Sequence, residues 1–263
     1  MGDPEPFKVR FWGVGNESWG CGGDFTPEEY AREYRRFTTW VPRYAVPLAF
    51  IASGPSGGDL EWTRRFFQRL TERDKGLLGR VYGWAMHYYC GTAGKGQAVD
   101  FTVDDWYELL EKASRMENLI KDHWAAMGQV DQNHRVKLIV DEWGAWHNQG
   151  SEVAPTHLFG QTSTLRDALV AGVTLDIFNR HADKVAMANV AQLVNNLHSL
   201  FLSREDKFVA TPNFHVFEMY SQHQGAKSLR TVLETPKPAR AGGGRRSCQS
   251  CPVPRRCATR RWC

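Results

Sequence analysis

The stretch VKLIVDEWG, residues 136–144, is an apolar run with one lysine that ends in two acids, a tryptophan and a glycine. A short apolar run closed by glycine is typical of a strand buried on both faces. Such strands occur in parallel sheets that are covered by helices. The stretch therefore predicts a buried parallel strand with two carboxylates at its carboxyl end.

The same pattern recurs along the chain, so the sheet should contain about five strands. The other apolar runs cover residues 9–15, 46–58, 81–89 and 185–193. Helical patterns follow them over about 27–38, 60–70, 102–120, 164–171 and 213–222. This alternation predicts an α/β fold, either a doubly wound open sheet or part of an eight-unit (β/α)8 TIM barrel.

Two of the predicted helices have clear start signals. Thr26, Pro27 and Glu29 supply a capping box with proline at the first helical position. Thr102 and Asp105 form a similar pair, and apolar residues at helical spacing continue beyond them to residue 120. We therefore expect one long helix over this second segment.

Composition and charge separate a globular body from a basic tail. The chain has 263 residues and is 42% hydrophobic, which fits one large domain and argues against disorder. Residues 236–263 hold eight of the 33 basic residues and none of the 29 acidic ones, so the remainder has a net charge of −4. A mildly acidic body gives no reason to expect nucleic acid or a membrane surface as a partner.

Cysteine usage divides the chain in the same way. Only Cys21 and Cys90 lie in the body, as expected for a protein of a reducing compartment. The tail carries four cysteines with the spacing C-x2-C-x5-C-x5-C, which is open to three interpretations: a zinc site, a disordered arginine-rich tail, or a product of a reading-frame error. We expect a catalytic domain over residues 1–235 and a disordered or frame-shifted tail over 236–263.

The sequence lacks the signals of a secreted or membrane protein. No apolar run is long enough to cross a bilayer, and the first residues do not resemble a signal peptide. We therefore expect a cytoplasmic location. No histidine or cysteine pair in the body has metal-site spacing, and no glycine loop fits a phosphate or dinucleotide fingerprint, so no metal or cofactor is expected.

Glu17 and Glu142 are each the first glutamate after a predicted buried strand, and tryptophans follow both. Parallel strands of one sheet end at the same face, where a barrel enzyme builds its active site. Two facing carboxylates among aromatic rings suit glycoside hydrolysis. The alternatives are that each acid caps a helix or pairs with a cation, that the tryptophans belong to the core, and that His87 is a hydrogen-bonded core histidine.

Several separate motifs, in the right order, resemble glycoside hydrolase family 51, the retaining α-L-arabinofuranosidases. They are GNESWGCGG, MHYY, LIVDEWGAW, TLRDALVAG and IFNRHADKVAMANVAQLVN, between about Phe7 and Gln224. The resemblance implies hydrolysis of terminal arabinofuranosides in arabinan or arabinoxylan oligosaccharides, and so a place in arabinose metabolism. Family members are often hexamers, which makes a homo-oligomer a further expectation.

The resemblance also implies residue roles. Glu17 matches the general acid/base after the fourth barrel strand, and Glu142 matches the nucleophile after the seventh. The implied sugar-site residues are Asn16 at the 2-hydroxyl, Trp19 beside Glu17, His87 and Tyr89 near the nucleophile, Trp146 as a wall, and Gln192 as a contact after the eighth strand.

The chain departs from the family pattern at both ends. Only 16 residues precede Glu17, whereas a barrel unit takes about 31, so we expect barrel strands four to eight alone. The likeness fades after about Gln224, and we expect the C-terminal β-sandwich domain of the family to be missing. We therefore expect the chain to be a truncated copy of such an enzyme with reduced activity. The alternatives are an inactive carbohydrate-binding or pseudoenzyme fragment, and a decayed gene product.

Overall fold

The computed structural model describes residue 2 and residues 5–44, 46–90, 96–148 and 159–232. The chain divides into two compact units. Unit 1 comprises Met1–His87, Asn118–Asp141 and Lys184–Met187. Unit 2 comprises Tyr88–Glu117, Glu142–Asp183 and the chain from Ala188 onward. The tail from residue 236, with its expected disorder or zinc site, lies outside the described residues.

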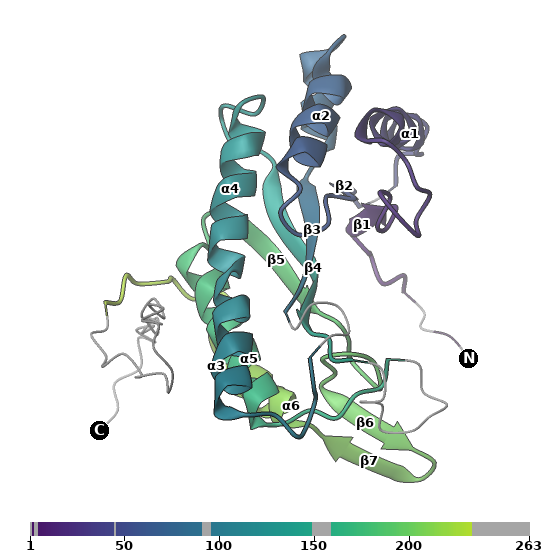
Figure 1. Ribbon diagram of the computed structural model, residues 1–263. Helices are drawn as coiled ribbons and strands as arrows, with labels where there is room; N and C mark the ends of the chain where they lie inside the picture. The colour runs from purple at the N-terminus through teal and green to yellow at the C-terminus, as the bar shows by residue number, and fades with distance from the viewer. Residues whose placement is uncertain (1, 3–4, 45, 91–95, 149–158, 233–263) are drawn as a thin grey trace, which may run out of the picture. The chain divides into compact units, whose positions relative to one another are not determined.

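A five-stranded parallel sheet forms the framework, and its strands follow one another in chain order (Figure 1). The strands are β1 (Phe11–Val14), β2 (Ala49–Ala52), β3 (Gly83–Cys90), β4 (Lys137–Ala145) and β5 (Val185–Val190). Phe11 pairs with Ala49, and Ile51 with Gly83, both in parallel register. Sequential order is typical of a barrel segment, whereas a doubly wound sheet reverses its strand order. The sheet is a parallel half-barrel, as the apolar runs indicated.

Helices follow the strands at the predicted places. They are α1 (Pro27–Thr39), α2 (Leu60–Thr71), α3 (Val103–Ser114), α4 (Met116–Gly128), α5 (Leu165–Arg180) and α6 (Pro212–Ser221), with a 3-10 turn, η1, at Lys75–Arg80. Capping boxes begin three of these helices, at Thr26, Thr102 and Thr164. In each, the threonine hydroxyl accepts a hydrogen bond from a backbone N–H of the first turn, and an acid three residues later accepts one from the backbone N–H of the threonine.

Three features differ from the sequence prediction. The first strand, β1, is not buried as expected, because it lies at the edge of the sheet and only Val14 in it is partly buried. The segment from residue 102 to 120 is not one long helix, because α3 ends at Ser114 and α4 begins at Met116. The apolar spacing runs on across this break, since Met116 and Ile120 are as buried as Ala113. A two-stranded antiparallel hairpin, β6 (Phe201–Arg204) with β7 (Lys207–Ala210), was not predicted.

The core of unit 1 lies between the sheet and its helices. Phe66, Phe67 and Trp84 are fully buried and pack ring against ring. The hydroxyl of Tyr30 donates to Val14 O at 2.5 Å and accepts from Ser53 N at 2.6 Å. This phenol on α1 therefore connects the carboxyl ends of β1 and β2, where the first predicted catalytic loop begins.

A second interaction chain connects α2, α4 and β3 inside unit 1. The Trp84 indole N–H donates to Thr63 Oγ1 at 3.2 Å, and Thr63 Oγ1 lies 3.0 Å from His123 Nδ1. His123 Nε2 lies 2.7 Å from Gly57 O. A neutral His123 with its proton on Nε2 satisfies every group in this chain, and burial lowers the pKa of His123 accordingly.

Unit 1 also contains a large apolar groove beside β1, at the end of the sheet order. Its volume is about 960 Å³, and its lining includes Phe7, Trp12, Phe37 and Tyr44. These four aromatic side chains are 84%, 51%, 67% and 62% exposed. So large an apolar surface marks a contact site or an aggregation hazard rather than ordinary protein surface.

In unit 2, a small core joins the carboxyl ends of the strands to the helices. Its buried members are Cys90, Leu109, Ala113, Ala145 and Val170. Among the described residues, no helix is both long enough and apolar enough to cross a membrane.

Candidate active site

A glycine-rich turn after β1 holds Glu17 in unit 1. Glu17 has a φ of +42°, a left-handed conformation that is unusual for a residue with a side chain. Its carbonyl accepts hydrogen bonds from Gly20 N at 2.8 Å and Gly22 N at 3.1 Å. A side chain at Gly22 would place its Cβ 1.6 Å from Asn16 O, so only glycine fits there. The turn therefore fixes Glu17 at the cost of local backbone strain, as functional sites often do.

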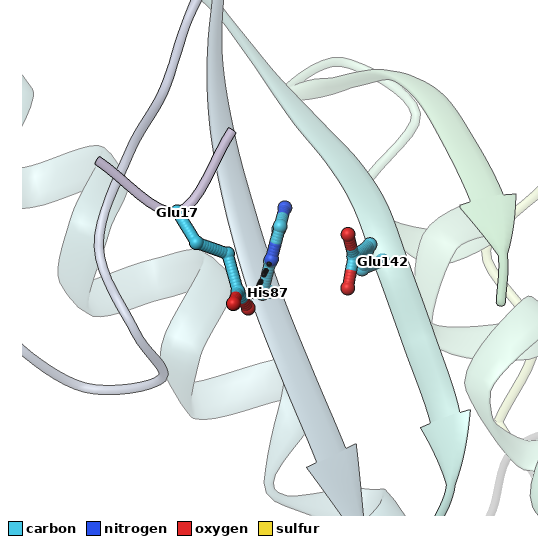
Figure 2. A group of neighbouring side chains, drawn as sticks. All are labelled: Glu17, His87 and Glu142. Atoms are coloured by element: carbon cyan, nitrogen blue, oxygen red, sulfur yellow. Dashed lines mark hydrogen bonds and ion pairs between the residues drawn. The ribbon is translucent and has the colours of Figure 1, made fainter. Parts of the chain in front are cut away.

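The carboxylate of Glu17 contacts a histidine and a cysteine. His87 Nδ1 lies 2.9 Å from Glu17 Oε1, the bond that is dashed in Figure 2. The thiol of Cys21 donates to Glu17 Oε2 at 3.3 Å. The Glu17 side chain is 23% exposed, so one part of it remains open to a ligand.

His87 lies between two carboxylates. Its Nε2 is 3.2 Å from Asp141 Oδ1, on the side of the ring opposite Glu17. The backbone of His87 is fixed as well, because its carbonyl accepts from Gly57 N at 2.9 Å. Each ring nitrogen of His87 therefore faces one carboxylate, Nδ1 that of Glu17 and Nε2 that of Asp141.

Glu142, the other carboxylate labelled in Figure 2, lies on β4 within unit 2. The Tyr89 hydroxyl donates to Glu142 Oε2 at 2.8 Å. The Tyr89 ring meets Trp146 edge to face at 5.3 Å, and Trp146 meets Phe159 in the same way at 5.0 Å. Glu142 is thus bound by the first member of an aromatic cluster whose faces can pack on an apolar sugar face.

The three remaining predicted residues lie on the expected loops. Asn16 is exposed and Trp19 is partly buried, both in the turn that holds Glu17. Gln192 is exposed directly after β5, and its backbone N–H donates to Asn196 O at 3.1 Å. The structure therefore joins Glu17 with His87 in unit 1, and Glu142 with Tyr89 and Trp146 in unit 2.

Several groups around the site were not found from the sequence. Cys21 contacts Glu17 and has no spacing signal of its own, whereas Asp141, which contacts His87, is one of the two acids expected at the end of its strand. In unit 2, Gln161 and His198 bind the backbone beyond Glu142. Both lie more than 15 residues from the strand they contact, so only the fold brings them there.

Buried ionisable groups surround the end of β4. Burial raises the pKa of the Cys90 thiol to about 12 and lowers the pKa of His198 to about 4. Asp167 accepts from His147 Nε2 at 2.7 Å. Burial is the largest single influence on the pKa of Asp167 and would raise it, but the hydrogen bond and charge of His147, with smaller contributions from His198 and the Thr164 backbone, together lower that pKa. The thiol and His198 are thus neutral, whereas Asp167 is ionised.

The sequence of this chain is similar to those of known arabinofuranosidases. Residues 141–256 match the family model described as the alpha-L-arabinofuranosidase C-terminal domain. An intracellular exo-alpha-L-arabinofuranosidase of Bacteroides ovatus is 40% identical over 240 residues, which cover 90% of this chain and 45% of that protein.

Solved structures agree with the sequence comparison. The crystal structure of the GH51 arabinofuranosidase from Xanthomonas axonopodis pv. citri matches with a TM-score of 0.83 and 37% identity, over 92% of this chain and 48% of that one. The alpha-L-arabinofuranosidase from Thermotoga maritima, solved as an arabinose complex, matches with a TM-score of 0.69 and 26% identity, over 90% and 45%. The chain thus spans about half the length of these relatives.

The family match corrects one expectation. The C-terminal domain of the family is not missing, because its model matches this chain from residue 141. The expectation assumed that this domain follows the barrel, whereas the match begins inside strand β4.

Proposed function

Because the chain is a partial-length member of glycoside hydrolase family 51, we propose that it is a retaining exo-glycosidase that acts on terminal non-reducing α-L-arabinofuranosides. The Bacteroides relative is named an exo-alpha-L-arabinofuranosidase, and the Thermotoga structure is named an arabinose complex. The observation that carries the proposal is that two carboxylates bind side chains of one strand, Glu17 through His87 and Glu142 through Tyr89.

We propose that the two carboxylates act on one sugar because the side chains they bind, His87 and Tyr89, lie on the same strand, β3. His87 and Tyr89 are two residues apart on this strand, so their side chains leave the sheet on the same face. Positions two residues apart on a strand are separated by about 7 Å. Glu17 binds the first and Glu142 the second. A retaining mechanism requires their carboxyl groups to be about 5 to 5.5 Å apart.

In the first step, one Glu142 oxygen attacks the anomeric carbon while the bond to the leaving oxygen breaks. Glu17 gives its proton to that oxygen. The products are an arabinosyl ester on Glu142 and a free alcohol. The Tyr89 hydroxyl donates to Glu142 Oε2, so we propose that it helps to orient the attacking carboxylate.

In the second step, Glu17 accepts a proton from water, the water oxygen attacks the anomeric carbon, and the ester bond to Glu142 breaks. Two inversions give arabinose with its original configuration. The proton from water returns Glu17 to its starting form for the next cycle, while His87 holds Glu17 through Oε1. We propose that Asn16, Trp19, Trp146 and Gln192 contact the sugar.

The finer assignments follow the family likeness. We propose that β1 to β5 correspond to barrel strands four to eight, that the substrates are arabinan and arabinoxylan oligosaccharides, and that the protein works in the cytoplasm, as the word intracellular in the relative's name suggests. We propose neither nucleic acid nor a membrane as a partner, and we propose that the chain forms a homo-oligomer.

The chain retains both carboxylates but about half the length of its relatives. We therefore propose reduced turnover relative to a full-length enzyme. The alternative function is sugar binding without turnover by an inactive fragment, and its support is the aromatic cluster of Tyr89, Trp146 and Phe159, which binds a sugar face without chemistry.

Leaving-group dependence tests the proposal. Glu17→Gln should slow hydrolysis of an alkyl arabinofuranoside far more than hydrolysis of a dinitrophenyl arabinofuranoside, because the dinitrophenolate leaving group needs no proton. Glu142→Gln should abolish hydrolysis of both. Glu205→Gln, at an exposed turn, is the matched control and should leave both rates unchanged. Binding of arabinose by all variants without turnover in any would establish the alternative. Turnover that survives Glu142→Gln would overturn the proposed nucleophile.

A further inference from the structure

Side chains of two later segments bind the backbone at the end of β4, the strand that carries Glu142. Gln161 Nε2 donates to Ala145 O at 2.8 Å, and Gln161 Oε1 accepts from His147 N at 3.0 Å. The backbone N–H of Ala145 donates to His198 Nδ1 at 3.2 Å. Gln161 and His198 thus supply the hydrogen bonds that a neighbouring strand would otherwise make to these backbone groups. Each of the two residues is at least 97% buried.

His198 also holds the loop that carries Gln192. Its backbone N–H donates to Ala191 O at 2.7 Å, while Ala191 N donates to Trp143 O at 3.1 Å. Ala191 directly precedes Gln192. One residue therefore joins two segments with proposed sugar contacts: the end of β4, with Glu142 and Trp146, and the loop after β5.

The bond to Ala145 requires one particular form of the imidazole. A backbone N–H can only donate, so Nδ1 of His198 must carry no proton and act as the acceptor. The charged groups that face this ring are Asp167 on α5 and, when protonated, His147 after β4. Complete burial outweighs the attraction of Asp167 and lowers the pKa of His198 to about 4, which keeps the ring neutral near pH 7.

Gly144 leaves the space in which His198 sits. It has a φ of +142°, and a side chain there would place its Cβ 2.5 Å from the Cβ of His198. Cys90 donates its thiol to Gly144 O at 3.2 Å, and Trp146 N donates to Cys90 O at 3.0 Å. The backbone from residue 143 to 147 is therefore fixed on several sides, and His198 packs closest to the glycine between Glu142 and Trp146.

We propose that His198 is a positioning residue, which as a neutral acceptor for Ala145 N–H fixes the Glu142–Trp146 segment and the Gln192 loop in their working arrangement. This role rests on the proposed function for its effect on turnover. His198 has no direct contact with the sugar in this account. Losing its acceptor should shift both the nucleophile and the sugar wall, and small displacements of reacting groups are costly in rate.

A pair of substitutions separates positioning from packing. His198→Asn places an amide oxygen near the position of Nδ1, whereas His198→Leu fills similar space without an acceptor. We expect His198→Leu to lower kcat on an aryl arabinofuranoside by roughly tenfold or more, and His198→Asn to recover most of that loss. Circular dichroism of both variants should match the original protein.

Two further measurements do not depend on turnover. In the full chain, nitrogen NMR should show His198 with its proton on Nε2 and with Nδ1 free down to about pH 5, since its pKa is about 4. Hydrogen exchange of the Ala145 amide should be slow in the original protein and in His198→Asn, and at least tenfold faster in His198→Leu.

These outcomes decide the role of His198 whether or not the proposed function holds. A proton on Nδ1, or equal Ala145 exchange in the Asn and Leu variants, would overturn the positioning role. Equal kcat in these two variants would do so as well. If the unaltered chain shows no turnover, the proposed function fails, and the NMR and exchange results still decide whether His198 fixes this strand end.

Discussion

The Tyr89 hydroxyl donates a hydrogen bond to Glu142 Oε2 across 2.8 Å, from the strand next to that of the carboxylate. A hydrogen bond to a charged group contributes about 1.5 to 3 kcal/mol, which corresponds to roughly tenfold to a hundredfold in rate. Tyr89→Phe keeps the ring against Trp146 but removes the donor. We expect kcat on an aryl arabinofuranoside to fall by about tenfold or more with little change in KM.

The exposed Tyr44 offers a control for the loss of a phenol. Tyr44→Phe should leave the rate unchanged. A Tyr89→Phe variant with full kcat would show that the phenol does not orient the nucleophile.

The second prediction concerns Cys21, an exposed cysteine whose thiol donates to Glu17 Oε2. N-ethylmaleimide adds a bulky group to sulfur and should block Glu17, so turnover should fall as Cys21 is modified. The other described cysteine, Cys90, is buried, and its pKa is raised to about 12 by burial, so it should not react.

Cys21→Ser supplies the control for this prediction. It keeps a hydroxyl donor and removes the reactive sulfur, so its turnover should persist and resist the reagent. Mass spectrometry of peptides locates the label. Equal inactivation of Cys21→Ser would assign the effect to another cysteine.

The third prediction is a dependence of stability on pH that arises from His198. Its folded pKa of about 4 lies below the value of 6.5 for an ordinary histidine, so protons bind the unfolded chain first. Stability should be complete above about pH 6.5 and decline as pH falls toward 4. Between pH 7.5 and 5 this one residue should remove about 2 kcal/mol from the free energy of unfolding. Buried His123 should act in the same direction.

Urea unfolding of the original protein and of His198→Asn at these two pH values measures the effect. The variant should lose less stability on acidification, because the titrating group is gone and other groups contribute equally to both proteins. His215→Asn, at an exposed site, should keep the original dependence. Identical pH dependence in all three proteins would contradict a depressed His198 pKa.

The fourth prediction concerns the apolar groove of unit 1. Phe37 on α1 lines it and is 67% exposed, whereas Phe208 on β7 in unit 2 is 62% exposed and lies outside it. Exposed apolar surface of this extent favours association. Phe37→Lys should lower the apparent mass of concentrated samples in light scattering, and Phe208→Lys should change it much less. Equal effects would show that the groove is not the contact surface.

Much of the fold could be predicted from the sequence because its signals are local. The capping boxes at Thr26 and Thr102 indicate helices within four residues, and the apolar runs mark the strands of the sheet. The break at Arg115 could not be predicted, because neither proline nor glycine marks it and Met116 continues the apolar spacing. The β6–β7 hairpin was missed because its turn, with Glu205 at a φ of +55°, lacks the usual asparagine or glycine.

The candidate site was predictable only in part, for the same physical reason. Glu17, His87, Tyr89 and Glu142 all lie in or after the last part of a strand of the parallel sheet, which is the position that sequence reasoning singles out for site residues. Cys21 lies in a turn and donates to Glu17 through a local fold of the backbone. His198 reaches Ala145 from 53 residues away, through a loop whose path depends on tertiary packing. No spacing rule in the sequence encodes such a contact.

The proposed pairing of Glu17 with Glu142 can be tested by the separation of their carboxyl groups in a crystal of this chain grown with arabinose. We expect about 5 to 5.5 Å between them, with the sugar ring touching both. A separation of roughly 6.5 to 9.5 Å would indicate an inverting mechanism instead. Carboxyl groups still farther apart, with arabinose bound elsewhere, would contradict the assignment of these residues as a catalytic pair.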